Sequence, residues 1–209
     1  ALYAKLESPR PQMEVKLISR QPVIDGKLDD PCWQDIPAHE YKTRDGKTVA
    51  AGRRTYVKGV FDREAVYFAF SMETDKELAD TKYSNPDHDF FISSDLVELF
   101  LKPGAKSIQL AIDHRGYKFE TSYGLKVGQK PACPWEGRVH KGPNGWTAEI
   151  RIPFKLLSEI DTVPPTDQTQ WQGNFCREYN AGKELQCWSP THANSFLNPE
   201  MFGSLIFRE

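Results

Sequence analysis

Apolar residues alternate with other residues along most of this chain, and a period of two is the pattern of a β-strand with one buried face. In the segment 65–72, Val66, Phe68, Phe70 and Met72 fall on one face. Comparable alternation occurs at 13–18, 94–101, 107–112, 117–123, 145–152, 171–179 and 204–207. Gly, Pro, Asn and Asp separate these segments, as in two-layered antiparallel folds. We therefore expect an all-β protein, an antiparallel β-sandwich of jelly-roll or immunoglobulin-like type.

Helical pattern is scarce and short. Pro31 can open one turn with Asp30 as its cap and Trp33 facing inward, and a second turn is expected over 154–160, after Pro153. The length of 209 residues suits one all-β domain. We assign residues 1–21 to an N-terminal arm and edge strand, and residues 22–209 to a single sandwich domain.

Composition argues against several classes of partner. The net charge is −2 and no run of Lys or Arg occurs, so a nucleic-acid-binding face is not expected. The apolar runs are far shorter than the ~20 residues that span a bilayer, so no membrane span is expected. The opening sequence ALYAKLESPRP has no signal-peptide pattern and reads as a mature or trimmed start.

The four cysteines lack zinc-site spacing. If the chain turns in a two-residue hairpin within 180–183, Cys176 faces Cys187 across the strand pair. Such opposed side chains can form a strained disulfide or remain two half-buried thiols. A bridge between Cys32 and Cys133 is a less favoured alternative.

Catalytic and metal motifs are absent from the sequence. Glu98 and Glu149 are the candidate carboxylates for glycoside hydrolysis, but a structural or solvated role is preferred for each, with Arg177 a possible partner of Glu149. The acidic loop 87–95, which contains Asp87, Asp89 and Asp95, is where a structural calcium would bind, although a plain acidic loop is preferred.

Four phrases occur in a fixed order: PVIDGKLDDPCW (22–33), SDLVELFL (94–101), GWTAEIRIPF (145–154) and CWSPTHANSFLNPEMFGSLIF (187–207). Together they resemble the family 9 carbohydrate-binding modules, which are β-sandwich domains often attached to secreted polysaccharide-degrading enzymes. The resemblance spans about residues 22–207. It implies a domain that binds a poly- or oligosaccharide without catalysis.

In the resembled family two loop aromatics sandwich the terminal sugar, while strand carboxylate, amide and guanidinium groups hold its hydroxyls. The carboxylate corresponds to Glu98, the amide-bearing loop to Asn194 and one aromatic to Phe196. Gln109 stands where an arginine is expected. The other aromatic position falls on Ile92, so either Phe91 or Trp135 would have to supply that ring.

Three of the other tryptophans are not expected at the binding site. Trp33, Trp146 and Trp188 lie in apolar patterns and are expected in the core.

These features predict a monomeric domain that is secreted, periplasmic or on the cell surface. Its expected ligand is a carbohydrate, and a catalytic domain in the same protein is a further candidate partner. Two alternatives remain open. One is a haem-binding sandwich with an axial ligand among Met72, Met201 and His192. The other is a protein-interaction or accessory domain of a glycoside hydrolase, docking through the face that carries Leu96 and Phe100.

Overall fold

The computed structural model describes residues 9–78, 90–91, 94–105, 107–123, 135–157 and 163–209. Three short 3-10 turns occur within these ranges: η1 (Pro31–Trp33), η2 (Phe154–Leu157) and η3 (Pro199–Met201). The strands are β1 (Gln12–Leu17), β2 (His39–Glu40), β3 (Lys42–Thr43), β4 (Thr55–Phe61), β5 (Ala65–Glu73), β6 (Leu96–Lys102), β7 (Ser107–Asp113), β8 (Lys118–Tyr123), β9 (Glu136–Gly142), β10 (Gly145–Pro153), β11 (Gln170–Tyr179), β12 (Glu184–Cys187) and β13 (Gly203–Arg208). The expectation of an all-β protein is confirmed.

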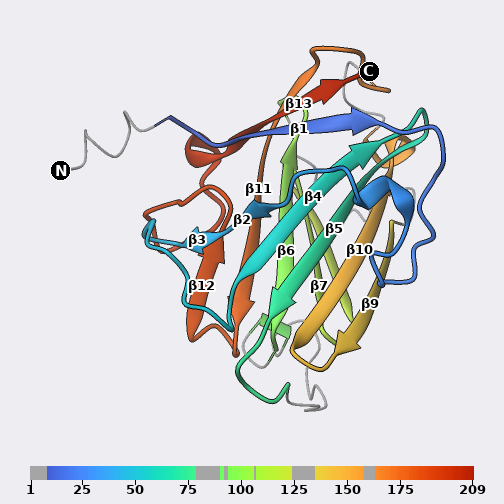
Figure 1. Ribbon diagram of the computed structural model, residues 1–209. Helices are drawn as coiled ribbons and strands as arrows, with labels where there is room; N and C mark the ends of the chain where they lie inside the picture. Colours follow the sequence, from blue (N-terminus) through green and yellow to red (C-terminus); the bar gives the residue numbers. More distant parts are fainter. Residues whose placement is uncertain (1–8, 79–89, 92–93, 106, 124–134, 158–162) are drawn as a thin grey trace.

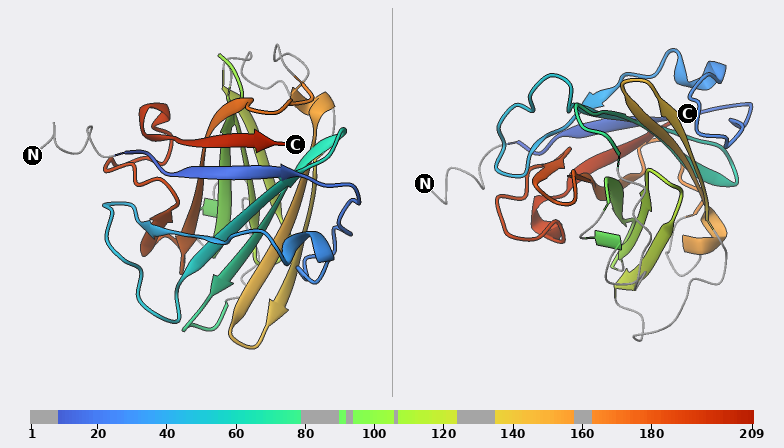
Figure 2. Two further views of the ribbon diagram at one scale, coloured as in Figure 1. Left: turned by 45° about the horizontal axis from the view of Figure 1, so that its top comes forward. Right: turned by 90° about the horizontal axis from the view of Figure 1, so that it is seen from below.

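The strands form one hydrogen-bonded sheet that folds over on itself. Its order is β8-β7-β6-β11-β13-β1-β4-β5-β10-β9, and β2, β3 and β12 pair beside this path. Figures 1 and 2 show β4, β5, β10 and β9 on one side of the molecule and β6, β7 and β8 on the other. The two layers of the expected sandwich are therefore joined through β11, β13 and β1.

Strand β1 differs from the expectation of an edge strand. It lies between β13 and β4 and pairs in parallel with both, through Met13↔Leu205 and Lys16↔Val60. The sheet is consequently mixed rather than purely antiparallel. The buried side chains of Met13 and Val15 alternate with exposed neighbours, a pattern that both edge and central strands can show.

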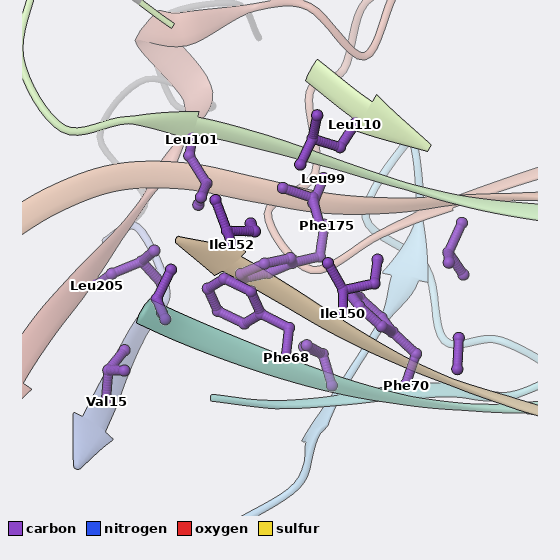
Figure 3. Close-up of a cluster of buried hydrophobic side chains, with 14 of the residues drawn as sticks. Val15, Phe68, Phe70, Leu99, Leu101, Leu110, Ile150, Ile152, Phe175 and Leu205 are labelled. Atoms are coloured by element: carbon purple, nitrogen blue, oxygen red, sulfur yellow. The ribbon is translucent and has the colours of Figure 1, made fainter. Parts of the chain in front are cut away.

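The main core lies between the two layers. Phe68 on β5 packs against Phe175 on β11, with ring centroids 4.8 Å apart. Figure 3 shows these rings among aliphatic side chains from β6, β7 and β10. All four residues of the 65–72 pattern are buried there, as are those expected at 97–101, 108–112 and 146–152. The alternation of residues therefore predicted the core faces of these strands correctly.

The tryptophans expected in the interior are buried. Trp146 and Trp188 lie in the main core, whereas Trp33 lies in a smaller cluster with Tyr67 and Val60. The turn at Pro31 forms as expected and directs Trp33 inward. Asp30 precedes this turn but makes no side-chain cap; its carboxylate accepts instead from the Val23 amide at 2.9 Å.

Strands β11 and β12 form the hairpin expected from the Asn-Ala-Gly-Lys turn. Cys176 and Cys187 lie directly opposite each other, and Ala181 and Gly182 take the positive φ angles that the turn requires. Both thiols are free and fully buried, and Cys32 is also free. Cys133, and hence the alternative bridge to Cys32, lies outside the described residues.

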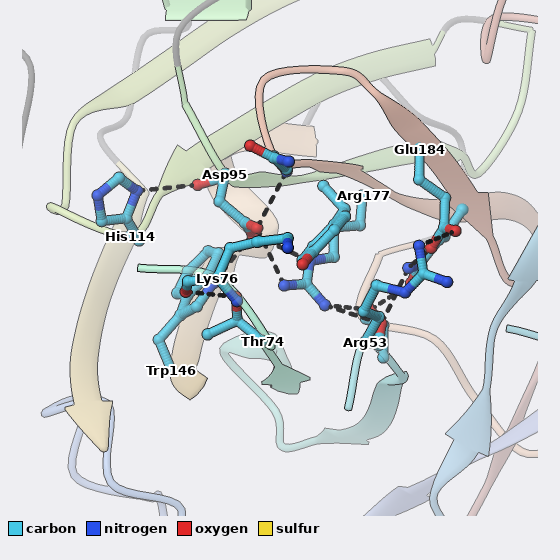
Figure 4. Close-up of polar contacts among 12 residues, drawn as sticks. Arg53, Thr74, Lys76, Asp95, His114, Trp146, Arg177 and Glu184 are labelled. Carbon is cyan, nitrogen blue, oxygen red and sulfur yellow. Dashed lines mark hydrogen bonds and ion pairs between the residues drawn. The ribbon is translucent and has the colours of Figure 1, made fainter. Parts of the chain in front are cut away.

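A buried ion pair joins β11 to the start of β6. Arg177 Nε and Nη2 donate to the two carboxylate oxygens of Asp95 at 2.9 and 3.0 Å, and Trp146 Nε1 donates to the same carboxylate at 3.0 Å (Figure 4). Arg177 also donates to the Arg53 carbonyl at 3.2 Å and to Thr55 Oγ1 at 3.0 Å. Arg177 therefore does not pair with Glu149, because its donors are taken up by Asp95, Thr55 and the Arg53 carbonyl.

Candidate functional site

The outer face of β6 carries a polar residue between two apolar clusters. Val97, Leu99 and Leu101 point into the core, so the residues between them point to the opposite face. On that face Leu96 packs with Phe90 and Ala111, and Phe100 packs with Phe196 and Phe202. Glu98 stands between these groups and is only 3% exposed. It therefore forms the polar floor between two apolar walls.

The neighbouring strands bring two more polar groups to Glu98. The register pairs Glu98 with Ala111 on β7 and Cys176 on β11, so Gln109 and Glu178 are its diagonal neighbours. Gln109 Nε2 donates to Glu98 Oε2 at 2.5 Å. The Glu98 and Glu178 carboxyls are close enough for each to influence the pKa of the other.

The pKa values of both carboxyls are raised above their ordinary range. Burial is the largest cause for each, because it disfavours the charged form. The charge of Glu178 raises the pKa of Glu98 further, while the hydrogen bond from Gln109 acts in the opposite direction. Two carboxyls so close together favour the uptake of protons, because ionisation of both would place like charges side by side.

A cavity of about 310 Å³ opens over this floor. It is lined by Phe91, Glu98, Phe100, Gln109, Glu178, Leu185, Asn194, Ser195, Phe196 and Leu197. Five of the six residues singled out in the sequence therefore lie around one cavity: Glu98, Gln109, Asn194, Phe196 and Phe91. They come from two strands, β6 and β7, and from two separate segments outside the strands.

Phe91 and Phe196, the two predicted aromatic residues at the cavity, pack against different side chains. Phe91 contacts Phe90 and Phe119 edge to face, with centroids 5.0 and 4.9 Å apart. Phe196 is 8% exposed and packs in the cluster that contains Phe100 and Phe202. Ile92, which occupies the position where the resembled family has an aromatic, lies outside the described residues. The structure thus places Phe91 at the cavity, whereas Ile92, the next residue, is not described.

Trp135 was expected as an alternative loop aromatic, and the structure contradicts this. It is 2% exposed, lies in the main core and does not line the cavity. Its Nε1 donates to Glu120 at 2.8 Å, and Lys118 Nζ stands 4.7 Å from the ring centroid. Gly137 makes this burial feasible, because a Cβ at that position would approach the Trp135 ring to 2.7 Å.

Glu149 does not join Glu98. It lies on β10 and accepts from the amides of Asp25 and Gly26 at 3.0 and 2.8 Å and from Trp33 Nε1 at 2.8 Å. A glycosidase needs both carboxyls beside one sugar, and these two stand on different strands in different surroundings. Glu149 instead secures the Asp25-Gly26 turn against β10, so the structural alternative is correct, with partners other than Arg177.

The other candidate positions also have definite surroundings. Met72 is buried in the main core, whereas Met201 and His192 line a separate cavity of about 480 Å³. Leu96 and Phe100 are both buried, so they present no apolar docking face.

The expected acidic loop is described only in part. Both Asp95 oxygens bond Arg177, and Asp87 and Asp89 lie outside the described residues. Within the described part of the chain no cluster of three or more His, Cys, Asp or Glu suits a metal ion. Over the same residues, no helix is long and apolar enough to cross a membrane.

Glu178 is the residue of the site that sequence reasoning missed. Alternation along β11 places Asn174, Cys176 and Glu178 on one face, which the sequence could have indicated. That this face adjoins Glu98 follows only from the pairing of β11 with β6, two strands far apart in sequence.

A cavity on the outer sheet face lined by two acids, two amides and three phenylalanine rings is the kind of concave site that binds a small ligand. The profile of the family described as "Carbohydrate family 9 binding domain-like" matches residues 24–209. The chain therefore belongs to that family, as the four sequence phrases indicated. A search of curated protein sequences found no significant match.

Solved structures show the same fold at low sequence identity. A family 9 carbohydrate-binding module from Caldicellulosiruptor kristjanssonii in complex with cellotriose is 17% identical, with a TM-score of 0.66 over 95% of this chain and 94% of that one. The glucose complex from that organism is 15% identical, with a TM-score of 0.67 and coverages of 95% and 96%. A putative carbohydrate-binding protein from Bacteroides uniformis is 15% identical, with a TM-score of 0.72 and coverages of 96% and 100%.

Proposed function

We propose that this protein binds carbohydrate non-catalytically in the cavity over Glu98. The observation that carries the proposal is the convergence of Glu98, Gln109, Asn194, Phe91 and Phe196 on one cavity. A sugar ring has an apolar C–H face and a rim of hydroxyls, and this lining offers aromatic surface for the first and polar groups for the second. Family membership and the sugar complexes of similar structures support the same reading.

The cavity suits one or two sugar units better than a long stretch of polymer, because its volume is about 310 Å³. Such a site binds the end of a chain or a short oligosaccharide. Affinities between about 1 mM and 1 μM, or roughly −4 to −8 kcal/mol, are typical of a shallow and hydrated site of this kind.

Catalysis is not part of the proposal. The two carboxyls at the cavity, Glu98 and Glu178, lie side by side on neighbouring strands. A hydrolase holds its carboxyls apart, about 5–9.5 Å, on either side of the bond that it breaks. We further propose that the domain acts outside the cytoplasm, secreted, periplasmic or on the cell surface, beside an enzyme that degrades glycans.

Calorimetric titration with glucose, cellotriose and short xylan and host-glycan oligosaccharides tests the binding proposal. We expect at least one neutral oligosaccharide to bind, and the double variant Glu98→Ala, Phe196→Ala to abolish that binding. Tyr117→Ala is the matched control, because Tyr117 is an aromatic side chain that is 54% exposed and does not line the cavity. Silence across the panel, or equal losses in the double variant and the control, would reject the proposal.

A further inference from the structure

The charge of the cavity is unusual for a site that binds sugar hydroxyls. Its ionisable lining residues, among those that the structure describes, are Glu98 and Glu178; the other lining side chains are apolar or neutral. The position where the resembled family suggests a guanidinium holds Gln109, whose amide donates to Glu98 but carries no charge. The described lining therefore has two acids and no base.

The position of the two acids favours a positive partner when both are ionised. Gln109 donates to one oxygen of Glu98, and Glu178 lies beside Glu98 on the neighbouring strand at the same cavity. Two carboxylates this close repel each other unless a proton or another cation lies between them. A ligand cation placed between the two carboxyls removes this repulsion.

We infer that the cavity prefers amino sugars, with the ligand's ammonium group bound between the carboxyls of Glu98 and Glu178. The inference rests on the proposed carbohydrate function and specifies the class of sugar. An ammonium group has three N–H donors and a full positive charge, so it can satisfy both acids at once. By the same reasoning uronic acids and sulfated sugars are disfavoured, because their negative charge would approach the buried Glu98 and the half-buried Glu178, with no basic side chain in the described lining.

Three trimers with the same β-1,4 linkage separate charge from shape: cellotriose, the glucosamine trimer and the N-acetylglucosamine trimer. They carry a hydroxyl, an ammonium or a neutral acetamide on carbon 2. Titration of the whole chain at pH 6.5 is expected to give an affinity about tenfold or more higher for the glucosamine trimer than for cellotriose, the effect of one charge-assisted hydrogen bond. The acetamide trimer should show no such gain.

The variant Glu178→Gln keeps the size of the side chain and removes its charge. It is expected to bring the ratio of the glucosamine and cellotriose affinities close to one. The matched control is Glu14→Gln, an exposed glutamate on β1 that does not line the cavity, and it should leave the ratio as in the wild type. Measuring a ratio in each protein keeps the result interpretable if overall affinity changes, and circular dichroism checks that each variant is folded.

The outcomes distinguish this inference from the proposed function. If cellotriose or another neutral sugar binds and the glucosamine trimer binds no better, the amino-sugar inference is wrong while carbohydrate binding stands. If no sugar of either kind binds, the proposed function itself fails. If the preference for glucosamine persists in Glu178→Gln, the ammonium is recognised elsewhere and the assignment to this acid pair is overturned.

Discussion

Arg177 on β11 holds Asp95 through two parallel N–H···O bonds, and both side chains are essentially removed from solvent. Asp95 immediately precedes β6, which carries Glu98, whereas Arg177 immediately precedes Glu178 in sequence. The ion pair therefore fixes the two strands that supply the acids of the cavity. Because alternate residues point to opposite faces, the anchor lies inside the sandwich and the acids lie outside it.

Replacement of Asp95 by Asn should destabilise the protein strongly. Arg177 would remain buried without a negative partner, a change that typically costs about 3–5 kcal/mol. Urea denaturation followed by tryptophan fluorescence measures the free energy of unfolding. Asp45→Asn is the control, since Asp45 pairs with Lys47 at the surface, and it should unfold almost as the wild type does. Equal losses in the two variants would mean that the Arg177 pair contributes no more than a surface pair.

The contribution of the Glu98 and Glu178 pair to stability should fall as the pH rises from acid toward neutral. The unfolded carboxyls titrate near 4.5, whereas in the folded protein the pKa of Glu178 is raised to about 7 and that of Glu98 to about 8. The folded state thus binds more protons between these limits. The stability that the protonated pair confers is complete below about pH 4.5 and is lost as the pH passes through about 7 and 8.

Chemical denaturation at several pH values between 5 and 8.5 measures this effect, which we expect to be on the order of a few kcal/mol. In Glu98→Gln one acid of the pair is gone, so the slope of unfolding free energy against pH should flatten in this window. Glu14→Gln is the control and should retain the wild-type slope. A Glu98→Gln protein with an unchanged slope would show that other groups govern the pH dependence.

Trp135→Phe should change stability without changing sugar affinity. The substitution removes the hydrogen bond to Glu120 and weakens the contact of Lys118 with the ring, together about 1–2 kcal/mol. Thermal unfolding measures the first effect, and calorimetric titration with whichever oligosaccharide binds the wild type measures the second. A clear loss of affinity in a folded Trp135→Phe protein would indicate that Trp135 contributes to sugar binding after all.

The thiols of Cys176 and Cys187 should react slowly with alkylating reagents in the native protein. Burial raises the pKa of the Cys176 thiol well above its ordinary value, so little of the reactive thiolate forms. Labelling with iodoacetamide before and after addition of urea, followed by peptide mass spectrometry, measures each cysteine separately. Rapid native labelling of either residue would contradict the buried hairpin, and recovery of a linked peptide without reductant would show that the pair is oxidised.

The alternation of residues predicted which face of each strand is buried, but not which strands are neighbours. Leu96, Glu98 and Phe100 were separated correctly from Val97, Leu99 and Leu101 because the strand period fixes that division. The contribution of Glu178 depends on β11 lying beside β6, a long-range pairing that local sequence does not encode. For the same reason Met13 and Val15 marked a strand but not its central place.

Trp135 illustrates a different limit of sequence reasoning. The two prolines in PACPWEG (131–137) favoured a loop position from which the ring could contact a ligand. The ring folds back over β9 because Gly137 leaves the space that any other residue would fill. By contrast, the resemblance placed Asn194 and Phe196 at the cavity, since it reflects the three-dimensional arrangement of relatives and does not depend on local pattern alone.

The central place of β1 also constrains the order of folding. Strand β1 lies early in the chain and pairs in parallel with both β4 and β13. Its hydrogen bonds therefore cannot all form until β13, near the other end of the described chain, is available. Pairings so distant in sequence are slow to form, and during synthesis a half-built sheet would wait with open edges. A chain that lacks β13 would leave one edge of β1 unpaired and open to association with other chains.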